Sequence, residues 1–294
     1  MPFFDDFTLT SIDLPRGPIR LRHGGSGPPL LLLHGNPQTH AMWNAIAPDL
    51  AQSYTVYAPD LRGYGGSVKP PATEDHSPYS KREMALDLIA LMEHFGHAQF
   101  RVAAHDRGAR VAHRMALDHP DAVQKLCLMD IVPTLEHFER ADMDFAMAYS
   151  HWFWLAQPHP IPEDMMNDNP SRWFHGHIRR APDADNFFHE QAEADYLNAL
   201  QDPNTIRGIC EDYRAAASID LVHDRDSRRI GHRIQCPLHV LWGTKGIIGK
   251  FYNPLDLWQQ YCDAKVTGHE VHSGHYLPEE NPTKVLGSLI DFLR

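Results

Sequence analysis

The stretch VAAHDRGARVAHRMA, residues 102–116, decides how the chain folds. It begins as an apolar strand, passes through a polar centre at Asp106, and continues with the spacing of a helix. Small residues such as Gly108 flank the centre, and a sharp turn from a strand into a helix needs them because the backbone folds closely upon itself there. The stretch therefore predicts a nucleophile elbow with an aspartate in the position of the serine.

Asp106 also has a structural interpretation. An aspartate at the start of a helix can cap it by accepting hydrogen bonds from backbone N–H groups of the first turn. Residues 102–116 alone leave this alternative open, and the remaining motifs of the chain favour the nucleophile.

Apolar strands alternate with helical patterns around this stretch. The expected strands are residues 18–25, 28–35, 53–60, 99–106, 125–132, 236–246 and 265–276. The expected helices are residues 41–53, 80–96, 109–120 and 281–294. In the second helix, Ser80 is a suitable N-cap and Gly96 a suitable C-cap. This alternation predicts a mostly parallel sheet covered by helices on both faces.

A different composition begins after Val132. Residues 134–225 are rich in Met, Trp, Phe, His and acidic groups, with helical spacing and little strand signal. The simplest organisation is a helical lid at 134–225 inserted into an α/β core formed by 1–133 and 226–294.

The composition limits the classes of protein. The chain has 294 residues, 43% hydrophobic and 22% charged, which suffices for one large α/β core with a smaller insertion. A formal net charge of -11 argues against nucleic acid or an anionic membrane as a partner. The same charge repels anionic small molecules unless the protein concentrates cations locally.

The N-terminal sequence and the cysteines favour a cytoplasmic location. The first residues, MPFFDDFTLT, lack the basic and apolar regions of a signal peptide, and no apolar run of about 18 residues suggests a membrane span. The four cysteines form no CxxC pair, so we expect buried free thiols at Cys127, Cys210, Cys236 and Cys262. The 21 histidines show no metal-ligand spacing, and no metal or other cofactor is expected.

The other parts of a catalytic triad have candidates near strand ends. The loop HGNP around Asn36 follows an early strand, where backbone N–H groups can form an oxyanion hole. His275 follows the last strand, where the base is expected. Asp130, at the end of the strand before the lid, is the candidate acid. Asp60 competes with it, but the surrounding YAPDLRGYGGS is more typical of a structural turn.

Four motifs together resemble the α/β-hydrolase-fold dehalogenases, and the fluoroacetate dehalogenase family above all. They are HGNP (34–37), HDRGAR (105–110), MDIVPT (129–134) and SGHYLP (273–278). The resemblance implies the α/β-hydrolase fold, with a mostly parallel sheet flanked by helices and a helical lid after the sixth strand. It also implies a homodimer. The family usually has HGFP where this chain has Asn36, and Trp173 is the nearest candidate for its additional lid tryptophan.

An aspartate nucleophile suits displacement at a saturated carbon, because the ester that forms has a carbonyl that can be hydrolysed. Asp106 is expected to attack the carbon, and His275, oriented by Asp130, to activate water against the ester. Backbone N–H groups near Asn36 and Arg107 are expected to hold the oxyanion.

Two arginines point to the substrate. Arg107 and Arg110 are three positions apart at a helix start, so they share a face and can form a fork for a carboxylate. The alternative is a solvated helix face with a salt bridge. Arg114, further along the helix, is expected to be structural.

The family resemblance assigns three lid residues to the halide. It implies that His151, Trp152 and Tyr213 donate hydrogen bonds to the departing ion, and a basic ion such as fluoride needs several donors in a dry pocket. The alternative for each residue alone is an aromatic lid core.

The sequence is therefore interpreted as a haloacetate dehalogenase that converts fluoroacetate to glycolate through an aspartyl ester. Its expected partner is a small haloacid substrate. Three alternatives remain: a dehalogenase that prefers chloride or bromide, an epoxide hydrolase, and an inert binding protein with the same fold. An epoxide hydrolase needs two lid tyrosines and has no use for paired arginines.

Overall fold

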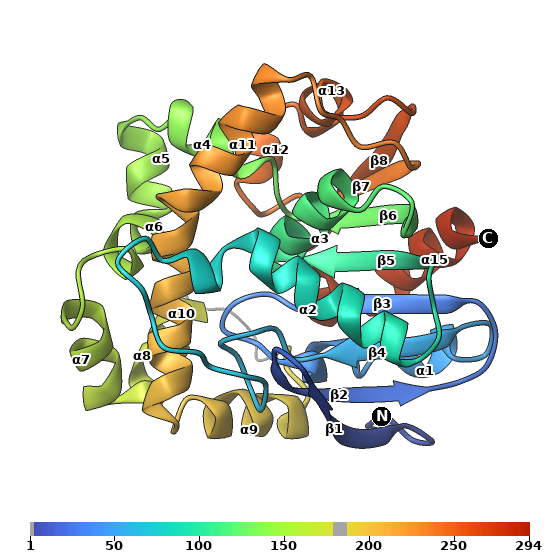
Figure 1. Ribbon diagram of the computed structural model, residues 1–294, viewed down its shortest axis with the longest axis horizontal. Helices are drawn as coiled ribbons and strands as arrows, with labels where there is room; N and C mark the ends of the chain where they lie inside the picture. The colour runs from blue at the N-terminus through green and yellow to red at the C-terminus, as the bar shows by residue number, and fades with distance from the viewer. Residues whose placement is uncertain (1–2, 179–186) are drawn as a thin grey trace.

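The computed structural model describes residues 3–178 and 187–294, and within them eight strands form one sheet (Figure 1). The strands are β1 (Thr8–Leu14), β2 (Gly17–Gly24), β3 (Pro29–Leu33), β4 (Thr55–Pro59), β5 (Phe100–His105), β6 (Val123–Met129), β7 (Leu238–Gly243) and β8 (Val266–Val271). Their order is β1-β2-β4-β3-β5-β6-β7-β8. The pairs β1–β2 and β2–β4 are antiparallel, and the other five pairs are parallel. The predicted mostly parallel sheet is confirmed.

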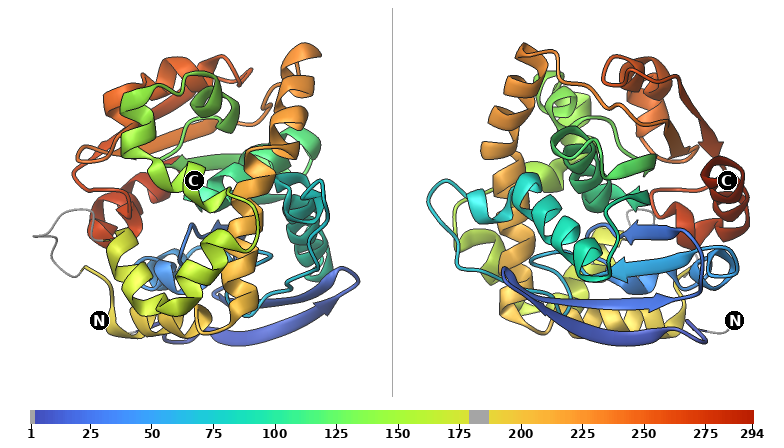
Figure 2. Two further views of the ribbon diagram at one scale, coloured as in Figure 1. Left: turned by 90° about the vertical axis from the view of Figure 1, so that its left-hand side faces the viewer. Right: turned by 45° about the vertical axis from the view of Figure 1, so that its right-hand side comes forward.

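Helices cover both faces of this sheet (Figures 1 and 2). On one face α2 packs against α3, and on the other α1 contacts α15. The helices of the core are α1 (Ala47–Leu50), α2 (Lys81–His94), α3 (Asp106–Asp118), α12 (Ile248–Phe251), α13 (Pro254–Gln259), α14 (Leu277–Glu280) and α15 (Pro282–Leu293), with 3-10 turns at His40–Trp43 and Ser77–Tyr79. Ser80 caps α2 by accepting from the backbone N–H of Glu83, and Gly96 follows the helix with a φ of +81°, as expected.

A group of helices between β6 and β7 covers one end of the sheet. These helices are α4 (Thr134–Glu139), α5 (Met143–Ala148), α6 (Ser150–Leu155), α7 (Ile161–Asp168), α8 (Pro170–Ile178), α9 (Glu190–Ala199), α10 (Pro203–Ala216) and α11 (Ile219–Arg229). Figure 1 shows α6 and α10 across the end toward which the β5 arrow points. Residues that follow the parallel strands therefore lie beneath these helices, which we call the lid.

Two elements differ from the sequence-based expectation. β1 was not predicted, because it is an edge strand whose residues are exposed or only partly buried, so it has little apolar signal. The single helix expected at 41–53 is instead a 3-10 turn followed by the short α1. Pro48 explains the break, since proline has no N–H to donate and disfavours helical backbone in the residue before it.

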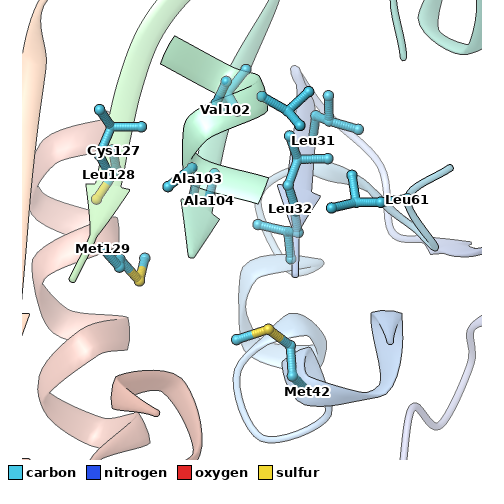
Figure 3. Packing of buried hydrophobic residues seen from close by; sticks show 14 of the residues in the cluster. Leu31, Leu32, Met42, Leu61, Val102, Ala103, Ala104, Cys127, Leu128 and Met129 are labelled. Carbon is cyan, nitrogen blue, oxygen red and sulfur yellow. The ribbon is translucent and has the colours of Figure 1, made fainter. Parts of the chain in front are cut away.

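The core lies between the sheet and its helices. Leu31 and Leu32 of β3, Val102 of β5 and Leu128 of β6 are fully buried, and their side chains are seen at close range in Figure 3. All four cysteines are free and buried, as expected. In the described part of the chain, no helix is both long enough and apolar enough to span a bilayer.

Candidate active site

Asp106 lies at the turn between β5 and α3. Its φ is +46°, in the left-handed region that non-glycine residues rarely adopt, so the backbone is strained there. Two glycines allow this turn, because a side chain at either position would clash with the neighbouring segment. A Cβ on Gly35 would lie 2.5 Å from the Cβ of Asp106, and a Cβ on Gly108 would lie 2.4 Å from the carbonyl oxygen of His34. The local structure is therefore the sharp strand-to-helix elbow that the sequence predicted.

The carboxylate of Asp106 is bound by a neighbouring loop. The backbone N–H of Asn36 donates to Oδ1 of Asp106 at 2.9 Å, and α3 has no side-chain cap. The capping interpretation of Asp106 is therefore wrong. The Asn36 N–H instead donates to the Asp106 side chain, and there it can stabilise negative charge on Oδ1.

His275 lies between two aspartates. Its Nδ1 donates to Oδ2 of Asp130 at 2.6 Å, and its Nε2 is 3.6 Å from Oδ2 of Asp106. The other oxygen of Asp130 accepts from the backbone N–H of Gly243 at 2.9 Å. Nε2 of His105 donates to the carbonyl oxygen of His275 at 2.7 Å and so holds its backbone. The structure brings together the three residues that the sequence proposed from separate strand ends.

Asp60, the competing acid, lies elsewhere. It is completely buried, and one of its oxygens accepts from the backbone N–H and the ring Nδ1 of His40. The other accepts from the Gly66 N–H and from Arg20. The structural interpretation of this residue is therefore confirmed.

The charges of the three residues are coupled. Burial alone would raise the pKa of Asp106, but contact with His275 and the neighbouring charges keep it well below its usual range. Burial alone would lower the pKa of His275, but Asp106 and Asp130 raise it to about 9. At neutral pH the resting site therefore holds an imidazolium beside the Asp106 carboxylate.

Arg107 is fully buried and is held by Asp212 of α10. Its Nε and Nη2 donate to the two carboxylate oxygens at 2.9 and 2.7 Å. Lys81 and Tyr64 bind the same carboxylate. The alternative, a solvated helix face with a salt bridge, is right about the salt bridge of Arg107 and wrong about solvation, because the pair is buried. The predicted two-arginine fork is corrected for Arg107, because Asp212 binds its Nε and Nη2. Nη1 of Arg107 is left without a partner among the described residues.

Arg110 differs from Arg107 because the described residues offer it no carboxylate. It is 3% exposed, and its Nη1 donates to the Val132 carbonyl and the Thr134 hydroxyl, each at 3.1 Å. Its guanidinium lies 4.5 Å from the ring centroid of Trp152, and no described residue accepts a hydrogen bond from its Nε. Burial and then the charge of Arg107 lower its pKa to about 10, so it stays cationic at neutral pH. Arg114 instead pairs with Asp224 and Asp118, as expected of a structural residue.

The three proposed halide donors lie together on the lid. Trp152 is 1% exposed, and its indole Nε1 has no hydrogen-bond partner among the described residues. The Tyr213 ring is 6.1 Å from that of Trp152 and 5.9 Å from that of His151. The Arg107 guanidinium lies 4.2 Å from the Tyr213 ring centroid. The aromatic group therefore lies directly against the buried cations beside the nucleophile.

A family model now adds to this geometry. The model of the alpha/beta hydrolase fold matches residues 28–282, which include the elbow, the lid and His275. The chain belongs to the α/β-hydrolase-fold family. A solved α/β hydrolase from Nostoc sp PCC 7120 superposes with a TM-score of 0.96 at 46% identity, covering 99% of each chain.

Two curated relatives cover nearly the whole of this α/β hydrolase. A fluoroacetate dehalogenase of Burkholderia sp is 41% identical over 99% of this chain and 95% of its own length. A soluble epoxide hydrolase of Corynebacterium sp. (strain C12) is 30% identical over 91% of each protein. The family model and the dehalogenase relative together show that the protein is a hydrolase.

The structure of this α/β hydrolase also shows residues near the site that sequence reasoning missed. Nε2 of His177 lies 3.4 Å from Nδ2 of Asn36, and the His177 ring is 5.1 Å from that of His151. Trp173 stacks on His177 at 5.0 Å, so His177 stands between this tryptophan and Asn36. No local motif marks His177, because it lies 141 positions from Asn36 in sequence. Within the described residues, no group of three His, Cys, Asp or Glu side chains is placed to hold a metal.

Proposed function

We propose that this α/β hydrolase removes the halogen from haloacetates, with fluoroacetate converted to glycolate and fluoride. The observation that carries the proposal is Arg110, a buried cation without a carboxylate partner among the described residues, close to the Asp106 nucleophile. A buried charge without a partner is costly, so this position is suited to an anionic substrate. The 41% identity to the Burkholderia fluoroacetate dehalogenase supports the same substrate.

In the first step, Oδ2 of Asp106 attacks the carbon that bears the halogen. Oδ1 is held by the Asn36 N–H, which leaves Oδ2 for the attack. The carbon–halogen bond breaks as the carbon–oxygen bond forms, and the bonding pair leaves with the halide. Nε1 of Trp152, a side chain that is 1% exposed, offers the departing ion a hydrogen bond.

In the second step, water attacks the ester carbonyl of Asp106. His275 accepts a proton from that water, and Asp130 stabilises the resulting imidazolium. The negative charge develops on Oδ1, where the Asn36 N–H donates. The intermediate collapses as the bond between the carbonyl carbon and Oδ2 breaks, and the His275 imidazolium returns its proton to the departing oxygen. Glycolate is released, and its hydroxyl oxygen comes from Asp106. Both steps use only protein groups and water.

Ester formation prepares His275 for this role. The negative charge of Asp106 helps to raise the pKa of His275 to about 9. The ester is neutral, so that contribution disappears and the pKa of His275 falls. The imidazole, 31% exposed, then loses its proton to solvent and becomes a base only after the first step is complete.

Epoxide hydrolysis is the second candidate. The 30% identical epoxide hydrolase favours it, as does the presence of two lid tyrosines, Tyr149 and Tyr213, whose rings both lie near that of Trp152. A neutral epoxide, however, does not compensate the charge of Arg110. The decisive experiment is to incubate the purified enzyme with fluoroacetate, chloroacetate and styrene oxide. We expect halide from the acids and little diol from the epoxide, and the reverse pattern would overturn the proposal.

We expect Arg110→Gln to lower kcat/KM for fluoroacetate by about 2 kcal/mol or more, roughly 30-fold, because a charge-assisted contact with the carboxylate is lost. The matched control is Arg114→Gln on the same helix, which should change stability rather than kcat/KM. The wild-type enzyme should also react poorly with fluoroacetamide. If the amide reacts as fast as the acid, Arg110 does not recognise a carboxylate.

Trp152→Phe and Tyr213→Phe should reduce defluorination more than debromination. Fluoride leaves as a basic, strongly solvated ion, so losing one donor in a dry site should slow its release by about 10²-fold. Bromide leaves readily and depends less on donors. Initial rates of the two halides from fluoroacetate and bromoacetate measure the difference, with Trp154→Phe as the control on the same lid helix. Equal losses on both substrates would mean that these rings only shape the lid.

A further inference from the structure

His137, like Arg110, is a buried polar side chain beside the site, and its hydrogen bonds are incomplete. It lies in α4, is 0% exposed, and has no partner for its Nε2 among the described residues. A buried polar atom without a partner costs free energy, so such an atom in a native structure calls for an explanation. The catalytic steps derived above do not use this residue.

The surroundings of His137 place it near Arg110, the residue that we propose binds the substrate carboxylate. Thr134, one turn earlier on the same helix, accepts from Nη1 of Arg110. The His137 ring lies 5.1 Å from the Trp152 ring, and the Arg110 guanidinium lies 4.5 Å from the same ring. His137 and Arg110 therefore both lie near the Trp152 indole. Helix α4 carries His137 and also the Thr134 hydroxyl that binds Arg110.

The hydrogen-bonding state of His137 follows from Tyr252. Nδ1 of His137 lies 2.9 Å from the Tyr252 hydroxyl. Burial, followed by the charge of Arg110, keeps the pKa of His137 well below its usual range, so the ring is neutral. Burial raises the pKa of Tyr252 to about 12, so its hydroxyl keeps its hydrogen and can donate to Nδ1. In that tautomer Nε2 carries the hydrogen and is a donor.

His137 and Arg110 each have a buried nitrogen without a partner among the described residues, Nε2 of His137 and Nε of Arg110. Nε of an arginine is always a donor, and Nε2 of His137 is a donor in this tautomer. Two unpartnered donors near one indole are what an anionic ligand group requires.

We propose that Nε2 of His137 donates a hydrogen bond to the substrate carboxylate, together with Nη1 of Arg107 and Nε of Arg110. Tyr252 positions His137, because its hydroxyl donates a hydrogen bond to Nδ1. This inference rests on the proposed function, since it takes the ligand to be a small 2-substituted carboxylate. His137 is then a substrate-binding residue, and Tyr252 is a positioning residue that acts through it.

The first test compares His137→Phe with His137→Gln. Phenylalanine keeps the aromatic shape but has no donor, so we expect KM for fluoroacetate to rise about tenfold or more while kcat changes little. Glutamine can place an amide N–H near the position of Nε2, and we expect it to recover most of the affinity. If both variants have the wild-type KM, the proposal is wrong.

The second test uses Tyr252→Phe. Without the hydroxyl, the hydrogen of the His137 ring can lie on either Nδ1 or Nε2, and only the second tautomer can donate to the substrate. We therefore expect a smaller rise in KM than in His137→Phe. In the double variant, Tyr252→Phe should add nothing to the effect of His137→Phe, because the two residues act as one unit. Additive effects would show that Tyr252 does not act through His137.

A matched control distinguishes a structural role of His137 from a role in substrate binding. His113→Phe replaces another buried histidine, which lies in α3 against Trp258 and whose Nε2 has no partner among the described residues. It should alter thermal stability without raising KM. If His137→Phe fails to fold, Tyr252→Phe carries the comparison, and a wild-type KM in that variant contradicts the proposal.

Calorimetry with glycolate separates this inference from the proposed function. Glycolate carries the carboxylate but no halogen, and its binding should weaken about tenfold in His137→Phe. Wild-type enzyme that binds glycolate but releases no halide would remove the dehalogenase function and leave the carboxylate site standing. Halide release with equal glycolate affinity in wild type and His137→Phe would remove the role of His137 alone.

Discussion

Asp106→Ala should abolish halide release from fluoroacetate, with a loss of about 10⁴-fold or more in kcat. The side chain supplies the attacking oxygen, and no other carboxylate lies on the elbow. The isosteric Asp106→Asn should be as inactive, because a neutral amide is a poor nucleophile at saturated carbon. A fluoride-sensitive electrode or ion chromatography on purified protein measures the rate.

The control for this pair is Asp118→Asn, which removes a carboxylate from the far end of the same helix, where it pairs with Arg82 and Arg114. It should keep most of the activity. Slow recovery by Asp106→Asn would be checked by mass spectrometry for deamidation back to aspartate. Full turnover by Asp106→Ala would remove the covalent mechanism.

His275→Asn should carry out the first step and then stop. Asp106 needs no base, because it attacks as a carboxylate, and the charge of Arg107, which also lowers the pKa of Asp106, remains in this variant. The ester then persists, because no group remains to activate water against its carbonyl. We expect one halide released per enzyme molecule, and mass spectrometry of a proteolytic digest should find the substrate fragment on Asp106.

His272→Asn is the matched control, because this exposed histidine lies on the same loop, three residues before the base. It should turn over normally and accumulate no ester. Repeated turnover by His275→Asn would assign hydrolysis to another residue. Failure to form the ester, with the fold intact, would mean that His275 also serves the first displacement.

Much of the fold could be predicted because its signals are local. Alternating apolar strands and helices predicted the parallel sheet, and the small residues around Asp106 predicted the elbow. Where the local signal is weak the prediction was wrong: the exposed edge strand β1 was missed, and Pro48 divided one expected helix into two short turns.

The positions of Asp106, Asp130 and His275 also follow from local information. Each comes directly after a strand or on the loop that follows one, and the carboxyl ends of parallel strands meet at one edge of a sheet. The structure places His275 between the two aspartates and in contact with each of them.

The sequence by itself determined the order of the elements, the aspartate at the elbow and the presence of two arginines after it. Only the tertiary structure decided how those arginines are used. Asp212 lies 105 positions from Arg107 and binds its guanidinium, whereas no carboxylate among the described residues pairs with Arg110. Tyr252 lies 115 positions from His137. The reason is physical: periodicity and turn chemistry depend on neighbouring residues, but whether a buried polar group is satisfied depends on side chains that only the folded chain brings into contact.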